Sequence, residues 1–499
     1  MNLNQHTAFD PFLQSIRERL QSVLRDRADV NQLSLNRGIP PFVLREVMSL
    51  NPLSVGIPKE YGGRGADIEE TLALLEVTSY ESLGMALTFG INLALFLQPV
   101  GKYALPESKQ EVFHRFMNQQ NMGGLMITEP GFGSDALNMQ TFYTKQEGSY
   151  RLSGMKHWAG LTGWADFWLL TARAQTPKGD LQRDIDFFIC DVTAPNQSIE
   201  VLEYFSNLGL YQIPYGLNKI EVEIPAHQKL IPESTGVKLM LDLLHRSRLQ
   251  FPGMALGFIQ RMIDEASEYM KKRMVGAKSL FYNDQVQYRL SVLQSYYTVC
   301  SAMCVKVSKI AGVNKDLSNE NILANSIKCV VSDMMQESAQ TATQLFGARA
   351  YKLDHIAGRG IVDSRPFQIF EGSNDMLYAQ ISAAALKLMK NTRESNLYTW
   401  LKSFDLTTRS SEFYQKLLNF KPDFSMPQRK MVDLGKILSK VISTEMVLDM
   451  ESTLFRKDLI NNALELLREE VGNLITSYQL KEIVPALENY KEGSNWRKS

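Results

Sequence analysis

Apolar residues recur at helical spacing along most of the chain. The stretches LQSIRERLQSVLRDRADV and 68–96 predict helices within residues 1–122, interrupted by the turn-rich GIPKEYGG at 56–63. From 123 to 232 the pattern changes to alternating or continuously apolar runs of strand length, DFWLLTARA, DIDFFICDV and LNKIEVEI. This second region is predicted to be a β-domain.

Long amphipathic stretches return after Pro232 and predict helices up to about residue 390. They include 325–346 and, after a break rich in Gly, Asp, Ser and Pro, a helix from about Asn374. Further helical stripes follow, the last of them running to Tyr490. The predicted fold class is therefore mainly α with a central β-domain, divided into 1–122, 123–232, 233–390 and a helical extension, 391–499.

Charge composition argues against a nucleic-acid partner. The 499 residues carry 54 Lys+Arg and 54 Asp+Glu, and the extension itself is balanced at 16 against 15. Without a net positive charge there is no global attraction to phosphates or to an anionic membrane. The N-terminus lacks a signal-peptide pattern, and no run approaches 18 uncharged apolar residues. We expect a soluble, cytoplasmic protein without membrane contact.

The four cysteines give no reason to expect a metal. None lies in a CxxC motif or in a Cys/His cluster at metal-binding spacing. Cys300 and Cys304 are one helical turn apart, which could suit a metal pair. Two small residues on a buried helix face are the favoured interpretation.

Two loops of the predicted β-domain carry candidate binding residues. The first, 128–135 (TEPGFGSD), can place backbone N–H groups and the Ser134 hydroxyl against a phosphate or a polar ring edge. It matches neither a P-loop nor GxGxxG, so alone it could be a simple turn. The second, 154–160 (GMKHWAG), offers Trp158, which could stack beside a flat cofactor or be buried in the sheet.

Two further candidates lie in the helical domain. In IFEGSND, Glu371 stands between apolar residues and a Gly-Ser turn. Desolvation would raise its pKa toward neutrality, which suits a general base for carbon acids. Alternatively it begins a helix that Ser373 or Asn374 caps. Arg273 and the QLFGA segment ending at Ala348 are ordinary phosphate partners, and equally ordinary helix features.

Taken in order, these motifs resemble the acyl-CoA dehydrogenase family over roughly residues 50–390. ITEPGFGSD is similar to the family's first flavin loop, TEPxAGSD, and LSGMKHW to its second signature. GFIQRMIDEASEYMKKR resembles the pattern that ends in Tyr-x-x-x-Arg, QLFGARAY resembles Gln-x-x-Gly-Gly-x-Gly-Tyr, and VDSRPFQIFEGSND resembles RDAxxxxIYEGTNE. The resemblance implies an N-terminal helical domain, a β-barrel-like middle domain and a C-terminal four-helix domain, with 391–499 as a helical appendage.

The resemblance also implies the activity. It is an FAD-dependent α,β-dehydrogenation of an acyl thioester, with CoA or an acyl carrier protein as the carrier. The expected electron acceptor is an electron-transferring flavoprotein, and the expected assembly is a homodimer or homotetramer. Small residues at Gly90 and Ala94, where the acyl tail would end, favour a medium or long chain. The extension is expected to cover the dimer or contact a partner.

Site roles follow by position in the motifs. Glu371 is placed on the catalytic base, and some relatives carry their base where this chain has Ser247, which cannot serve. The residues placed on cofactor contacts are Met126, Thr128, Gly133, Ser134, Trp158, Gly160, Arg273, Asp284, Gln344, Gly347, Ala348, Ser373 and Asn374. Those placed on substrate contacts are Ser134, Arg248 and Gly372.

Several positions depart from the family pattern. The family's Trp-Ile-Thr is Trp158-Ala159-Gly160 here, which removes a hydroxyl expected near the flavin. In the family's Arg-x-x-Phe-Gly pattern, which begins here at Arg273, Gly276 occupies the position of the Phe, so an aromatic ring expected near the cofactor is missing. Asp284 replaces a Gln that faces the neighbouring FAD, where a phosphate would repel it. These changes keep two alternatives open. One is a flavin oxidase or monooxygenase of the same fold; the other is a non-enzymatic flavoprotein, which the balanced charge of the extension disfavours.

Overall fold

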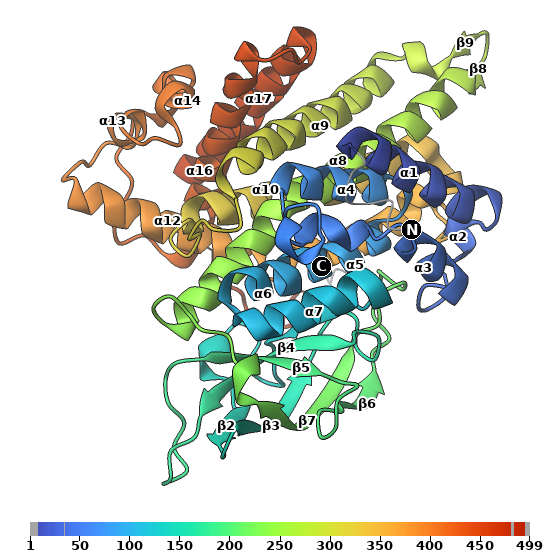
Figure 1. Cartoon of the computed structure of the whole chain (residues 1–499). Helices are drawn as coiled ribbons and strands as arrows, with labels where there is room; N and C mark the ends of the chain where they lie inside the picture. Colours follow the sequence, from blue (N-terminus) through green and yellow to red (C-terminus); the bar gives the residue numbers. More distant parts are fainter. Residues whose placement is uncertain (1–7, 34, 481–483, 495–499) are drawn as a thin grey trace.

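A curled sheet occupies one end of the molecule and helices form the rest. The computed structural model describes residues 8–33, 35–480 and 484–494. Figure 1 shows the sheet at the bottom, the N-terminal helices above it, and the extension on the far side of the long central helices. The predicted fold class, mainly α with a central β-domain, is confirmed.

The N-terminal helices pack on the central bundle and on one another. Asp67 caps the helix that begins at Ile68, its carboxylate accepting hydrogen bonds from the N–H groups of Glu69 and Glu70. The helices are α1 (Phe9–Gln21), α2 (Val30–Leu33), α3 (Pro41–Met48), α4 (Ile68–Glu81), α5 (Leu83–Asn92), α6 (Gln98–Tyr103) and α7 (Pro106–Gln119).

The seven-stranded sheet runs in the order β1-β4-β2-β3-β7-β6, and β5 pairs with β4. The continuously apolar β4 is buried along most of its length, whereas β7 alternates buried and exposed positions, as their sequence patterns predict. The strands are β1 (Gly123–Met126), β2 (Phe142–Lys145), β3 (Ser149–His157), β4 (Phe167–Ala174), β5 (Asp186–Asp191), β6 (Glu200–Tyr204) and β7 (Gly216–Pro225).

One helix of 37 residues, α8 (Gly236–Lys272), runs through the centre of the molecule. At 1.5 Å per residue it is about 55 Å long, and its middle section is buried because α4 and α10 pack against it. The other elements of this region are the short strands β8 (Met274–Val275) and β9 (Lys278–Ser279) and the helices α9 (Asp284–Ile310), α10 (Asn321–Phe346), α11 (Ile356–Ser364) and α12 (Asn374–Asn391).

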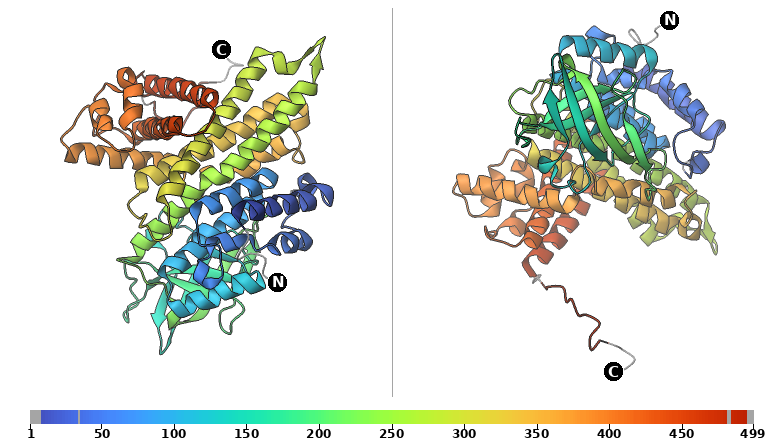
Figure 2. Two further views of the ribbon diagram at one scale, coloured as in Figure 1. Left: turned by 45° about the horizontal axis from the view of Figure 1, so that its top comes forward. Right: turned by 90° about the horizontal axis from the view of Figure 1, so that it is seen from below.

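The extension is helical as predicted, up to Leu480. Its helices are α13 (Leu397–Lys402), α14 (Thr408–Phe413), α15 (Gln415–Leu418), α16 (Gln428–Asp449) and α17 (Lys457–Leu480). The helix expected to continue to Tyr490 is not formed by residues 484–490, and 481–483 lie outside the described residues. Residues 484–494 instead leave the helices and run into solvent (Figure 2), and Val484, Leu487 and Tyr490 are 85%, 74% and 66% exposed.

Among the residues that the structure describes, one helical run is long and apolar enough to cross a membrane. It is Leu83–Tyr103, 21 residues with a mean hydropathy of 1.6, so the expectation that no such run exists is wrong. Within the protein, 94% of that window is buried, and it spans α5, the π-helical turn Leu93–Leu97 and α6. A helix surrounded by protein is apolar on all sides, and this accounts for its composition.

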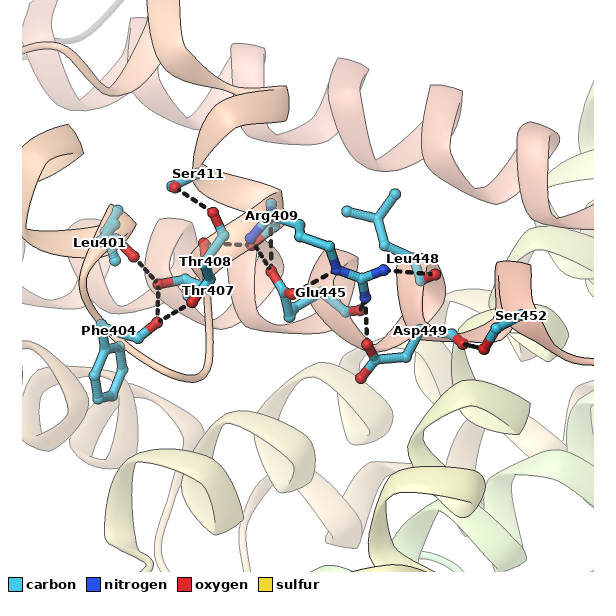
Figure 3. Close-up of polar contacts among 11 residues, drawn as sticks. Leu401, Phe404, Thr407, Thr408, Arg409, Ser411, Glu445, Leu448, Asp449 and Ser452 are labelled. Atoms are coloured by element: carbon cyan, nitrogen blue, oxygen red, sulfur yellow. Dashed lines mark hydrogen bonds and ion pairs between the residues drawn. The ribbon is translucent and has the colours of Figure 1, made fainter.

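A carboxylate from α16 caps the first turn of α14. Thr407, at the N-cap position, makes no side-chain capping bond. Glu445 Oε2 instead accepts hydrogen bonds from the N–H groups of Arg409 at 2.9 Å and Ser410 at 2.7 Å (Figure 3). The Arg409 guanidinium reaches Asp449 and the Leu448 carbonyl near the end of α16. The two elements therefore satisfy each other's free backbone groups.

Replacing Glu445 with alanine is expected to lower the free energy of unfolding by about 0.5–2 kcal/mol, the usual cost of losing an N-cap. Arg409→Ala should cost at most about 1 kcal/mol, because that side chain is half exposed and water screens its ion pair. Urea unfolding of both variants measures the difference. An equal loss in both would show that the ion pair, and not the cap, joins α14 to α16.

Candidate active site

Glu371 lies in a tight turn before α12, and not in the helix itself. Its φ is +56°, and the φ of the following Gly372 is +94°, so two consecutive residues adopt the left-handed conformation. A non-glycine residue there is strained, and such strain persists only where neighbouring groups fix the backbone. The interpretation of Glu371 as a helix-start carboxylate is therefore wrong, since α12 begins at Asn374.

The two oxygens of the Glu371 carboxylate differ in their surroundings. Oε1 accepts a hydrogen bond of 2.5 Å from the Ser247 hydroxyl of α8. Oε2 is buried and has no hydrogen-bond partner among the described residues. Burial raises the pKa of Glu371 above its ordinary value, although the Ser247 hydroxyl and the nearby Arg248 and Lys328 favour the charged form. One oxygen is thus fixed, and the other is free to accept a proton.

Two buried cations hold the strained backbone of this turn. The Arg248 guanidinium donates to the Glu371 carbonyl at 2.6 Å and to Asn325 Oδ1 at 2.7 Å. The Lys328 ammonium, on α10, donates to the Gly372 carbonyl at 2.8 Å. Burial lowers the pKa of Lys328 to about 8. These bonds secure two consecutive carbonyls, and so they fix the direction of the Glu371 side chain between α8 and α10.

Asn374 joins the start of α12 to α10. Its side-chain oxygen accepts from Lys328 at 2.8 Å, and its amide donates to Ser332 Oγ at 3.0 Å and to Asp333 Oδ1 at 2.7 Å. The side chain is thus committed to the protein interior, and only the Asn374 backbone could meet a ligand. Ser373 occupies the N-cap position of α12 but makes no side-chain capping bond, so neither residue caps the helix through its side chain.

The two predicted flavin loops are joined beneath the sheet surface. Lys156 is fully buried, and its ammonium lies 2.8 Å from Glu129 Oε1 and 2.9 Å from Thr171 Oγ1. Burial lowers the pKa of Lys156 to about 8. Burial alone would raise the pKa of Glu129, but Lys156 and the backbone N–H of Gln140 hold it below its ordinary value. An ion pair therefore ties loop 128–135 to β3.

The residues of these loops differ in accessibility. Met126 is buried at the end of β1 and Thr128 is half-buried, whereas Gly133 and Ser134 are exposed. Trp158 follows β3 with φ +57° and is 52% exposed, so the alternative of a buried sheet tryptophan is wrong.

Gly160 lies two residues after this exposed ring. A Cβ added there would meet Ile91 Cδ1 at 2.7 Å. The space that a larger side chain would use is therefore filled by Ile91.

A second cluster forms where α8 and α10 end. The Tyr269 ring lies 5.1 Å from that of Phe346, and the guanidinium groups of Arg273 and Arg349 lie 5.9 and 5.2 Å from the same Tyr269 ring. Two exposed arginines thus lie beside the same ring, and guanidinium groups are suitable partners for a diphosphate. The remaining predicted residues of this cluster are also exposed: Asp284, Gln344, Gly347 and Ala348.

The Glu371 site and the arginine cluster are far apart within one chain. Ser247 and Arg273 are separated by 26 positions, nearly all within α8, which corresponds to about 39 Å along the helix. Figure 1 shows β8 and β9, next to Arg273, at the opposite extremity from the sheet. The structure therefore separates the predicted residues around Glu371 from those around Arg273.

Five polar residues of the site were not predicted as contributors from the sequence. Glu129 and Lys156 lie inside motifs that were recognised, but nothing local shows that they pair. Lys328 and Asn325 interrupt a mostly apolar helix stretch, ILANSIKCVV. Polar residues in such a stretch are expected to be buried and hydrogen-bonded, but the pattern does not show which group they bind. Arg349 directly follows the QLFGA segment, and no local pattern shows that it lies beside Tyr269.

Comparison with known proteins identifies the family. The chain matches three consecutive family profiles: "Acyl-CoA dehydrogenase, N-terminal domain" at residues 10–120, "Acyl-CoA dehydrogenase, middle domain" at 124–221 and "Acyl-CoA dehydrogenase, C-terminal domain" at 234–386. A curated short-chain-specific acyl-CoA dehydrogenase of Megasphaera elsdenii is 25% identical over 351 residues, covering 69% of this chain and 90% of the relative.

Solved structures share the fold. The butyryl-CoA dehydrogenase of Megasphaera elsdenii superposes with a TM-score of 0.67 at 22% identity, covering 76% of this chain and 98% of its own. An acyl-CoA dehydrogenase from Bacillus anthracis complexed with FAD reaches a TM-score of 0.74 at 16% identity, covering 94% of this chain and 87% of its own. Because three profiles in order account for most of residues 10–386, the chain belongs to the acyl-CoA dehydrogenase family of oxidoreductases.

Proposed function

We propose that this enzyme removes the α-proton and the β-hydride of an acyl thioester, with Glu371 as the base. The observation that carries the proposal is the different bonding of the two carboxylate oxygens. Ser247 donates a hydrogen bond to Oε1, whereas the buried Oε2 has no hydrogen-bond partner among the described residues. A general base needs a fixed position, a free oxygen and a raised pKa. Glu371 meets all three requirements.

The residues around Glu371 act by positioning. Arg248 and Lys328 bind the carbonyls of Glu371 and Gly372, so the carboxylate keeps its direction when its charge changes. Their positive charges also favour the carboxylate, which keeps the base ionised despite burial. Exclusion of water strengthens hydrogen bonds to the developing negative charge of the thioester.

The residues present fit FAD. The exposed Trp158 ring and the exposed hydroxyl of Ser134 beside Gly133 offer a stacking face and polar contacts for a flat ring. The paired Arg273 and Arg349 suit its diphosphate. We place Met126, Thr128 and Gly160 near the ring and the backbone of Ser373 and Asn374 beside it. When bound, FAD supplies the acceptor for the β-hydride.

We propose a dimer in which each FAD site uses both chains. Arg273 lies about 39 Å along α8 from Ser247, so one dinucleotide is more simply shared between two chains. Gln344, Gly347 and Ala348 would join Arg273 on the partner's cofactor, while the carboxylate of Asp284 would have to face away from its phosphates.

The domain division at 122, 232 and 390, the cytoplasmic location and an electron-transferring flavoprotein as acceptor remain proposals. One structural neighbour is itself titled an electron transferring flavoprotein of Acidaminococcus fermentans. The carrier could be CoA or an acyl carrier protein. One structural neighbour is the prolyl acyl carrier protein oxidase AnaB, with a TM-score of 0.68 at 17% identity. Its name supports including acyl-carrier-protein thioesters among the candidate substrates.

Anaerobic mixing with acyl thioesters tests the proposal. The purified flavoprotein is mixed with acyl-CoAs and acyl-carrier thioesters of graded length, and the flavin absorbance is followed. Loss of that absorbance with one chain class is expected. Bound FAD that no thioester reduces would contradict the proposal, and rapid reoxidation by oxygen during turnover would favour an oxidase.

A further inference from the structure

A buried amide between α5 and α8 has no hydrogen-bond partner. Gln250 is 2% exposed. Neither its Nε2 nor its Oε1 is bonded to any group in the part of the chain that the structure describes. Buried polar groups in proteins are almost always paired with protein or with ordered water, so an amide with both ends unpaired calls for a partner.

The position of Gln250 relates it to the proposed base. It follows Ser247 by three residues on α8, and residues three apart lie on the same face with their Cβ atoms about 5–6 Å apart. Ser247 is bonded to Glu371, whose Oε2 is also buried and unpaired. The unsatisfied amide on α8 therefore lies about one helical turn from Ser247, the residue that binds the carboxylate of the proposed base.

The helix opposite the amide offers it no polar group at the nearest position. Gly90 on α5 has no side chain, and a Cβ built there would stand 3.9 Å from Gln250 Oε1 and 3.5 Å from Met254 Sδ. These are ordinary contact distances, so α5 approaches the amide closely, with space for about one carbon atom between them. Gly90 therefore gives the amide no side chain to bond with.

We infer that Gln250 determines substrate specificity by binding a neutral polar group, a hydroxyl or an amide, on the acyl chain beyond its β-carbon. This inference rests on the proposed function. The side-chain amide offers two donors and one acceptor without charge, which suits a neutral group better than a carboxylate. An apolar chain in the same place would leave the amide unpaired, so it would bind less well.

Matched substrate pairs test the inference. Flavin reduction is compared for 4-hydroxybutyryl-CoA against pentanoyl-CoA and for 5-hydroxypentanoyl-CoA against hexanoyl-CoA, pairs that differ in one hydroxyl or methyl. We expect at least one hydroxylated member to give a kcat/KM at least about tenfold higher, because a site built to bind a hydroxyl rejects its analogue. Gln250→Met, similar in size and helix propensity, should reverse this preference.

Thermal unfolding gives an independent readout. Gln250→Met should raise Tm by about 1–4 °C, since it removes an unpaired buried amide. The matched control is Gln336→Met on α10, where the Gln336 Oε1 accepts a hydrogen bond of 3.1 Å from Ser364. That variant should lower Tm. A fall in Tm for Gln250→Met would show that the amide is already satisfied and would overturn the inference.

The substrate outcomes separate this inference from the proposed function. Reduction by apolar thioesters that equals or exceeds reduction by their hydroxylated partners, unchanged in Gln250→Met, would overturn only the inference. No reduction by any thioester would overturn the proposed function and the inference with it.

Discussion

Replacing Glu371 with glutamine is expected to lower the rate constant of flavin reduction by an acyl thioester roughly 10²–10⁴-fold, the usual contribution of a positioned general base. Glutamine keeps the size of the side chain and an oxygen that can accept the Ser247 hydrogen bond. The loss would therefore report the missing proton acceptor. Anaerobic stopped-flow absorbance measures it under single-turnover conditions.

The control variant replaces another partly buried carboxylate, Glu76, and so tests whether the loss of any such carboxylate slows flavin reduction. Burial also raises the pKa of Glu76, on α4, but it contacts none of the groups that hold Glu371. Glu76→Gln should leave flavin reduction unchanged. If the Glu371→Gln rate falls by less than tenfold, or if both variants lose the same factor, Glu371 is not the base.

The dependence on pH gives a second signature. The rate of flavin reduction should rise with pH as Glu371 ionises, with an apparent pKa above the ordinary value of 4.5. In Glu371→Gln this rise should disappear. A rate in the native enzyme that rises only around the ordinary carboxyl pKa would argue that burial does not tune this group.

The ionisation of Glu371 should also change the stability of the fold: the contribution of Glu371 to the free energy of unfolding should fall with pH, whereas the rate of flavin reduction rises. Because the pKa of Glu371 is higher in the folded state than in the unfolded state, its contribution to stability is greatest below the unfolded pKa. That contribution is lost as pH rises through the two values, so at neutral pH Glu371→Gln should be at least as stable as the native protein.

Replacing Lys156 with methionine should lower the free energy of unfolding by about 3–5 kcal/mol, the cost of leaving one member of a buried ion pair alone. Glu129 would then be a buried carboxylate whose remaining partners are backbone N–H groups of Gln140 and Thr141. Loop 128–135 should also loosen, so FAD content should fall. Urea unfolding followed by tryptophan fluorescence reports largely on this domain, which contains Trp158, Trp164 and Trp168 of the five tryptophans.

Two controls separate the ion pair from a general lysine effect. Lys219→Met removes a half-exposed lysine of β7, which lies 3.6 Å from Glu200, and should cost at most about 1 kcal/mol. Adding Glu129→Gln to Lys156→Met should recover part of the loss, because the unpaired charge is gone. A double variant as unstable as the sum of the single variants would mean that the two residues do not interact.

Local patterns were sufficient for the secondary structure. The alternation of LNKIEVEI predicts the half-buried β7, and the helical stripe at 325–346 predicts most of α10, because both periods follow from backbone geometry. The helix expected through Tyr490 fails where no other element packs against residues 484–490, since most helical stability comes from tertiary packing.

The candidate site was predicted only in part. Short motifs singled out Glu371, Trp158 and Arg273 because their chemistry is visible in neighbouring residues. The hydrogen-bond partners of this turn could not be predicted from the sequence, because they come from distant segments. Ser247 is 124 positions from Glu371, and Lys328 is 44 positions from Gly372. No local pattern encodes which buried donor meets which acceptor.

The sequence by itself determined the order of helices and strands, the family and the residue types able to perform the chemistry. Tertiary structure decided how those residues are used. It bonded one oxygen of Glu371 to Ser247 and paired Lys156 with Glu129. Within residues 8–33, 35–480 and 484–494, it left the other Glu371 oxygen and the Gln250 amide without a hydrogen-bond partner. The physical reason is that periodicity is a property of a single element, whereas burial and hydrogen-bond pairing arise only when elements pack together.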